Sequence, residues 1–131
     1  MLVAYDCWLR ISEVSGLTVA DVYDTRGQVD PVGRGVSVFL DETKTGRRQA
    51  VTLEEPAVAA LLLTLARAQG QRTARLFPAP DKLRRVLARC LEALNIEAHG
   101  LVFVWHGFRH GGASRAFLRG DEISSILVRG R

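Results

Sequence analysis

The chain has 131 residues, of which 47% are hydrophobic, so we expect one domain with a single packed core and exclude a disordered chain. Its two cysteines, Cys7 and Cys90, have neither the spacing of a zinc site nor the number of a disulfide-stabilised fold. The most apolar run, 57–66, is too short to span a membrane, and the first residues lack the basic stretch of a signal peptide. We therefore expect no membrane contact and an intracellular protein, cytoplasmic in a prokaryote and nuclear in a eukaryote.

The net charge of +4 is unevenly distributed along the chain. Residues 1–66 carry 6 basic and 9 acidic side chains, whereas residues 67–131 carry 12 basic and 5 acidic ones. Eleven of those twelve cations are Arg, whose planar guanidinium suits phosphate better than the ammonium group of Lys. The second half of the chain is therefore the predicted face for a polyanion. The alternative is a solvated surface or an Arg-rich codon bias.

The hydrophobic pattern predicts a mainly helical domain with a small antiparallel β-sheet, an α+β fold. Residues 2–16 are expected to form one helix that ends at Gly16, and residues 17–22 a connector. The period then changes to two over 36–41, where Val36, Val38 and Leu40 alternate with Ser37, Phe39 and Asp41. A turn at 45–48 and a run at 49–53 follow, which together predict a hairpin of two short strands with Lys44 at its bend.

The remainder of the chain predicts helices. Glu55-Pro56 is typical of a helix start, and this helix should continue to about Gly70 and lie centrally, because most of its faces are apolar. After a loop at 78–80, a helix from Asp81 should have an apolar stripe and a cationic face. The stripe comprises Leu83, Val86, Leu87, Cys90, Leu91 and Leu94, and the cations are Lys82, Arg84, Arg85 and Arg89. Residues 108–119 predict a helix ending at Gly120, and Asp121 a cap on a last helix.

Three short motifs contain the residues best suited to bind a phosphodiester. His106 and Arg109 should project one turn apart at a helix start, where free N–H groups and the helix dipole favour phosphate. Arg10 lies in an apolar segment, where an arginine is costly unless it is paired or faces a cleft, and Glu13 can orient it. Taken singly, H-x-x-R favours a buried His–Arg pair and Lys44 favours a solvated turn lysine, while Arg10 and Glu13 also fit a surface ion pair.

In this order, R-x-S-E at 10–13, a lysine turn at 43–46 and H-x-x-R-H at 106–110 resemble the catalytic domain of the tyrosine recombinase (phage integrase) family. The resemblance covers nearly the whole chain. It implies cleavage and rejoining of double-stranded DNA through a 3′-phosphotyrosyl intermediate, without metal or cofactor. It also implies a role for each of several residues. The catalytic residues would be Arg10, Lys44, His106 and Arg109, with Lys44 as the acid that protonates the departing 5′ oxygen. The supporting residues would be Glu13 and His110, and the residues that bind DNA would be Arg47, Arg48, Arg84 and Arg85.

The chain also departs from the family. The nucleophilic tyrosine would fall after Arg131, because Tyr5 and Tyr23 lie at the other end of the sequence, and we expect residues 1–131 not to include the family's amino-terminal core-binding domain. Residues 1–131 are therefore expected to be a single partial catalytic domain that is inactive alone, and the full-length protein to form homo-oligomers on DNA. Gly111-Gly112 replaces bulkier residues, a variant associated with eukaryotic mobile elements. Two alternatives remain, a non-catalytic DNA-binding remnant of a mobile element and a fragment resembling type IB topoisomerase.

Overall fold

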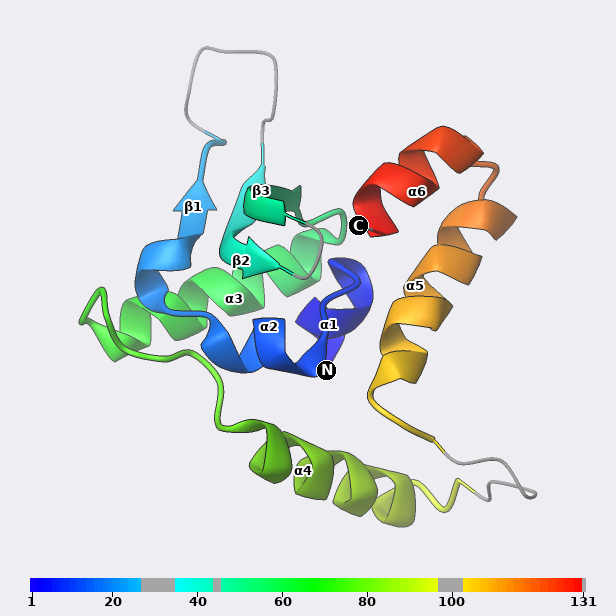
Figure 1. The fold of residues 1–131 in the computed structure, drawn as a ribbon. Coiled ribbons are helices and arrows are strands. Elements are labelled where there is room, and N and C mark those ends of the chain that lie inside the picture. Colours follow the sequence, from blue (N-terminus) through cyan, green and yellow to red (C-terminus); the bar gives the residue numbers. More distant parts are fainter. Residues whose placement is uncertain (27–34, 44–45, 97–102, 131) are drawn as a thin grey trace.

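The computed structural model describes residues 1–26, 35–43, 46–96 and 103–130, with the backbone alone for 42, 43 and 46–48. The fold is mainly helical with a small antiparallel sheet, as predicted, and the sheet has three strands in the order β1-β2-β3. Figure 1 shows the sheet on one side of α1 and α2, with α4 on the other and α5 beside α1. The elements are α1 (Leu2–Asp6), α2 (Ile11–Gly16), the 3-10 helix η1 (Val19–Asp21), β1 (Val22–Asp24), β2 (Val36–Thr43), β3 (Gly46–Thr52), α3 (Pro56–Gln69), α4 (Pro80–Ala93), α5 (His106–Leu118) and α6 (Ile123–Gly130).

The single helix predicted over residues 2–16 is wrong, because the chain turns sharply between α1 and α2. Trp8 has a φ of 55°, a left-handed conformation that costs a bulky residue on the order of 1–3 kcal/mol. The turn buries Cys7, Trp8 and Leu9 in succession, which one face of a continuous helix would not do. Arg10 then caps α2, and its backbone N–H donates to Glu13 Oε2 at 2.7 Å.

The predicted hairpin is confirmed, and its strands pair as far as Thr43 and Gly46. The bend between these two residues, with Lys44, lies outside the described residues. The prediction of a turn over 45–48 is wrong, because the ladder continues through the pair of Glu42 and Arg47. A third strand, β1, lies just after the predicted connector and pairs with β2. Alternate residues of the sheet enter the core, namely Val36, Val38, Leu40, Val51 and Leu53.

The helices α3 and α4 begin and end close to their predicted limits. The expectation that α3 is central is wrong, because it packs through one face against α1, η1 and β1 and leaves Leu61 60% exposed. The apolar stripe of α4 is narrower than predicted. Leu83 and Leu87 are buried, whereas Val86 is 40% and Leu94 69% exposed. Gly70 ends α3 with a φ of 69°, which a glycine adopts at little cost.

At the carboxyl end, the structure differs from the prediction mainly in the last two helices. Helix α5 begins at His106, two residues earlier than predicted, after the buried Trp105. Helix α6 contributes no fully buried residue and folds back toward β3, so polar contacts hold much of it in place (Figure 1). Within the described ranges, no helix is both long and apolar enough to cross a membrane.

Glycine at position 112 permits the close packing of α5 on α1. A Cβ added to Gly112 would overlap the indole ring of Trp8 and lie 2.5 Å from the carbonyl oxygen of Tyr5. The added atom would meet backbone and a buried ring, neither of which can move freely. The absence of a side chain at this position is therefore a packing requirement of the α1–α5 contact.

We predict that Gly112→Ala destabilises the fold by at least about 1–3 kcal/mol, because the methyl group overpacks the α1–α5 contact. Gly107→Ala is the matched control, since a Cβ at Gly107 on the same helix meets no atom within 4 Å. That control should be neutral or stabilising by up to about 1 kcal/mol, because alanine favours the helix. Urea unfolding of both variants measures the difference, and equal stabilities would contradict the close contact.

Candidate functional site

The first turn of α2 fixes the orientation of Arg10. Its guanidinium Nη1 lies 2.8 Å from Glu13 Oε1, while its backbone N–H donates to the other oxygen of the same carboxylate. The Glu13 side chain is 5% exposed and that of Arg10 is 25% exposed. A carboxylate that binds both the backbone and the side chain of Arg10 holds the guanidinium in one direction, at the edge of solvent.

Arg109, on the first turn of α5, lies against the same segment. Its Nη1 donates to the carbonyl oxygen of Trp8 at 3.1 Å, two residues before Arg10. Burial lowers the pKa of Arg109, and the positive charge of Arg10 lowers it further, whereas Glu13 acts in the opposite direction. Two arginines separated by almost a hundred residues in the sequence are therefore close enough to influence each other electrostatically.

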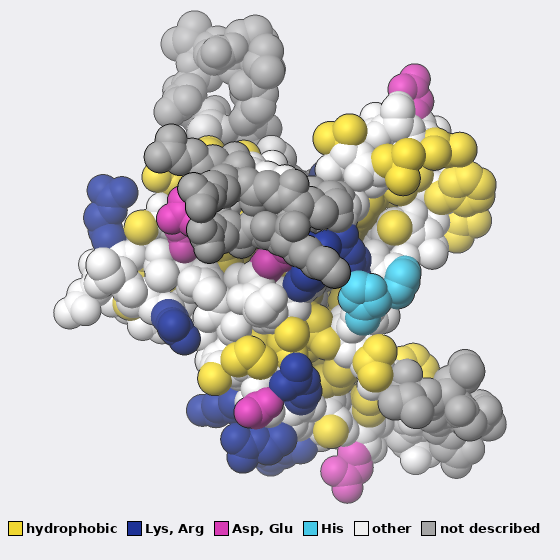
Figure 2. Space-filling model, viewed as in Figure 1, with side chains coloured by type: hydrophobic (Ala, Val, Ile, Leu, Met, Phe, Trp, Pro, Cys, Tyr) yellow, Lys and Arg dark blue, Asp and Glu magenta, His cyan; other side chains and the backbone are white. Residues whose placement is uncertain are grey.

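Two histidines complete the cationic group. The rings of His106 and His110 meet edge to face, with centroids 4.5 Å apart. Desolvation lowers the pKa of His106, and so do the positive charges of His110, Arg109 and Arg10, in that order. His106 is thus neutral near pH 7 and can donate or accept a proton. Figure 2 shows the histidine side chains together on the surface, beside Lys and Arg side chains.

The backbone at the start of α5 does not supply the anion-binding amides predicted from the sequence. The N–H of Gly107 donates to Val104 at 2.9 Å, and that of Phe108 to Trp105 at 3.1 Å. A turn before the helix therefore satisfies the amides that would otherwise face a ligand. The groups left to hold a phosphate here include the side chains of Arg10, Arg109 and the histidines.

Of the remaining predicted site residues, only Arg84 and Arg85 have described side chains, and both belong to α4. Lys44 is outside the described residues, and so are the side chains of Arg47 and Arg48, whose backbone belongs to β3. Arg84 pairs with Asp81 at 2.7 Å, with both side chains well exposed. Lys82, Arg85 and Arg89 are exposed and form no ion pair within the described part of the chain. Figure 2 shows Lys and Arg side chains gathered over α4, on the same face as the histidines.

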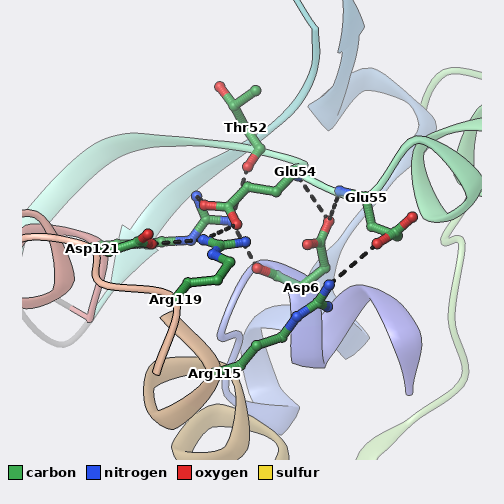
Figure 3. A network of polar contacts seen from close by, with 8 residues as sticks. Asp6, Thr52, Glu54, Glu55, Arg115, Arg119 and Asp121 are labelled. Atoms are coloured by element: carbon green, nitrogen blue, oxygen red, sulfur yellow. Dashed lines mark hydrogen bonds and ion pairs between the residues drawn. The ribbon is translucent and has the colours of Figure 1, made fainter. Parts of the chain in front are cut away.

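A second polar network, which the sequence analysis did not identify, joins α5 and α6 to the start of α3 (Figure 3). Arg119 contacts Glu54 at 2.8 Å and Asp121 at 2.6 Å, and Arg115 contacts Glu55 at 3.5 Å. Arg129 also binds Glu54, at 2.7 Å. The carboxylate of Asp6 accepts the backbone N–H groups of Glu54 and Glu55 at 3.1 and 3.3 Å.

This network revises the electrostatic prediction. Part of the positive charge of the second half is paired with Glu54 and Glu55 of the acidic first half, so it is not all available to a polyanion. The signal was present in the sequence, because opposite net charges on the two halves of one domain favour pairing between them. Within the described part of the chain, the exposed cations without an ion pair include Lys82, Arg85 and Arg89 on α4, and also Arg67, Arg72 and Arg75.

Neither a metal nor a cofactor has an evident set of ligands. Within the described ranges, His, Cys, Asp and Glu form no group of three or more with the geometry to hold a metal ion. A groove of about 660 Å³ lies between β3 and α6, with Trp8 and Arg129 among its lining residues. Its charged groups, Glu54, Asp121 and Arg129, already pair within the protein.

Comparison of the chain with protein-family models finds no match, and comparison with curated proteins finds no similar sequence. The resemblance to tyrosine recombinases therefore rests on the three sequence motifs alone. Function has to be argued from the chemistry of the site.

Asp6 provides a test of the second network through pH. Burial raises the pKa of Asp6, and the backbone N–H groups of Glu55 and Glu54 oppose that rise. A raised folded-state pKa means that the contribution of Asp6 to stability is complete below the unfolded pKa and is lost as pH rises through the folded pKa. Asp6→Asn keeps an oxygen that accepts both N–H groups, but it cannot ionise.

We therefore predict that the free energy of unfolding of Asp6→Asn, relative to the parent chain, increases between pH 4 and pH 7. Asp6→Ala removes the acceptor altogether, and it should cost about 1–3 kcal/mol at either pH because two partly buried N–H groups lose their partner. Denaturant unfolding at several pH values measures both effects. A difference between Asp6→Asn and the parent that is independent of pH would contradict the raised pKa.

Proposed function

We propose that this chain is the phosphate-binding core of a DNA strand-cleaving and rejoining enzyme of the tyrosine recombinase type. The observation that carries the proposal is the meeting of Arg10 and Arg109 at Trp8. Arg109 donates to the Trp8 carbonyl, and Arg10 follows two residues later with its guanidinium held by Glu13. Two fixed, partly exposed guanidinium groups with a histidine beside them suit the non-bridging oxygens of a phosphodiester.

Each residue has a distinct part in the proposed reaction. Arg10 and Arg109 would neutralise the charge that develops on the non-bridging oxygens as the phosphorus is attacked. His106, neutral near pH 7, would share this hydrogen bonding or transfer a proton, with His110 as its neighbour. Lys44, on the hairpin between β2 and β3, would protonate the departing 5′ oxygen. This division of labour comes from the family resemblance.

The attacking tyrosine is not supplied by Tyr5 or Tyr23 in this proposal. Tyr5 packs against Gly111, since a Cβ there would lie 3.0 Å from Tyr5 Cε2. Gly111 follows Arg109 by two residues, about 200° around the helix axis, so Tyr5 lies on the flank of α5 away from the Arg109 side chain. Tyr23 belongs to β1 and packs edge-on against Phe39, with ring centroids 4.6 Å apart.

A second candidate is a DNA-binding domain without catalysis, a remnant of a mobile element. The exposed cations of α4 favour it, because Lys82, Arg85 and Arg89 have no ion-pair partner within the described part of the chain. Such a surface neutralises phosphates whatever the base sequence. Both candidates bind duplex DNA, and they differ in whether the Arg10–Arg109 pair forms a specific phosphate site.

We predict that the chain binds duplex DNA weakly, with micromolar affinity at best, and that affinity falls steeply with salt. Arg109→Ala should lower the slope of log affinity against log salt by about one unit, because one phosphate contact is lost. Arg10→Ala should do the same. Arg67→Ala removes an equal charge from the last turn of α3, the end opposite to the one that pairs with Arg115 of α5, and serves as the matched control. Fluorescence anisotropy across a salt series measures all four proteins.

The outcome separates the two candidates. If Arg109→Ala and Arg10→Ala behave like Arg67→Ala while the fold persists, the proposed phosphate site does not exist. If Arg84→Ala and Arg85→Ala lower the slope and the site variants do not, the non-catalytic candidate is favoured.

Covalent chemistry gives a further prediction. Incubated with a nicked DNA duplex, this chain should form no covalent adduct, whereas a chain continued beyond Arg131 with the proposed tyrosine should form one that resists denaturation. Denaturing electrophoresis with labelled DNA detects the adduct. An adduct from residues 1–131 that disappears in Tyr5→Phe would overturn the assignment of the nucleophile.

A further inference from the structure

Trp8 receives contacts from both α5 and α6, which ties the candidate site to the last helix. Its carbonyl oxygen accepts the hydrogen bond from Arg109 Nη1 at 3.1 Å. Its indole ring faces the guanidinium of Arg129, whose central carbon lies 5.3 Å from the ring centroid. The same ring lies against the backbone of α5 at Gly112. A displacement of Trp8 would therefore move the acceptor that holds Arg109.

Arg129 holds the main chain on both sides of this contact. Its Nη2 donates to the carbonyl oxygen of Asp6 at 2.7 Å and to that of Thr52 at 3.1 Å, and its Nη1 pairs with Glu54 at 2.7 Å. Asp6 ends α1 and precedes Trp8 by two residues. One guanidinium thus fixes the backbone just before Trp8 and contacts the ring of Trp8. Only the planar guanidinium fork offers several donors in this arrangement.

Trp8 needs such support because its backbone is strained. A φ of 55° is unfavourable for a bulky residue and persists only where the surroundings hold it. The Arg129 side chain is 19% exposed, well below the 42% of Arg119 in the same network. Arg129 is therefore the more buried of these two arginines, and it is the one in contact with Trp8.

We propose that Arg129 is a positioning residue for Arg109, acting through the backbone and ring of Trp8. This inference rests on the proposed phosphate site and deepens it, because it makes the placement of α6 a determinant of anion binding by α5. Without the Arg129 guanidinium, the Asp6–Trp8 segment relaxes, the Trp8 carbonyl moves, and Arg109 loses its fixed direction.

A double-mutant cycle tests this coupling with a short DNA duplex as the probe. Arg129→Ala should weaken binding roughly five- to tenfold at fixed salt in the parent chain, and hardly at all in the Arg109→Ala background. Arg119→Ala is the matched control. It removes the same charge and also an ion pair with Glu54, but it does not remove the cation that faces the Trp8 ring. Its effect should be small and equal in both backgrounds. Additive effects of Arg129→Ala and Arg109→Ala would overturn the proposal.

Arg129→Lys separates position from charge, and it is the milder variant if Arg129→Ala unfolds. It keeps the positive charge but not the fork, so its affinity should fall nearly as far as that of Arg129→Ala. Full affinity in Arg129→Lys would show that charge alone matters and would refute the positioning role.

A measurement without DNA distinguishes this inference from the proposed function. The Nε–H resonance of Arg109, identified by its loss in Arg109→Ala, should shift in Arg129→Lys and stay in place in Arg119→Ala. An unchanged resonance overturns the positioning role whatever the DNA results. A shifted resonance combined with normal DNA binding by Arg109→Ala would uphold the positioning and reject the phosphate site.

Discussion

A buried tryptophan in a left-handed backbone conformation joins the elements that form the candidate site. The strain at Trp8 costs on the order of 1–3 kcal/mol. Burial of an indole removes roughly 200 Å² from water, which contributes about 5 kcal/mol at 25 cal/mol per Å². Trp8 is 3% exposed, so burial outweighs the strain. The turn is stable because α5, through Gly112, closes over the ring.

The attachment of α6 follows a different balance. This helix has no fully buried residue, and the ion pairs just before it and at its end, Arg119–Asp121 and Arg129–Glu54, involve carboxylates that are about a third exposed. Exposed ion pairs contribute little individually, commonly under about 1 kcal/mol. The contacts of Arg129 differ because they are more buried and include two backbone carbonyls. Arg129 therefore dominates the docking of α6, and a helix held by one such anchor is among the less stable parts of a fold.

Sequence reasoning predicted the elements whose signal is local. Alternation over 36–41 identified the hairpin, and Pro56 and Gly70 marked the limits of α3. The break at Trp8 had no local signal, since a positive φ is expected of glycine or asparagine and not of tryptophan. Its cause is tertiary, in the packing of α5. The same holds for Arg129, whose partners Asp6, Thr52 and Glu54 are distant in the sequence.

The predicted site residues also divide into those placed by a local sequence signal and those placed by tertiary contacts. The pair of Arg10 and Glu13 follows from a spacing of three on a helix, and it is present. The approach of Arg109 depends on the Trp8 carbonyl, which spacing alone could not reveal. Only the order of the motifs, compared with a known family, suggested that these segments meet. The catalytic role of Lys44 stays a prediction from that comparison.

In the proposed function, the charges of the cluster would link phosphate binding to proton uptake. Desolvation lowers the pKa of His106, and the positive charges of His110, Arg109 and Arg10 lower it further, which favours the neutral imidazole near pH 7. A phosphodiester bound between Arg10 and Arg109 would bring negative charge to the same place and raise that pKa. The imidazole would then be more readily protonated in the complex than in the free protein. In the proposed reaction, His106 would therefore be a stronger hydrogen-bond donor when the scissile phosphate is present, and repulsion among the cations would be lowest in that state.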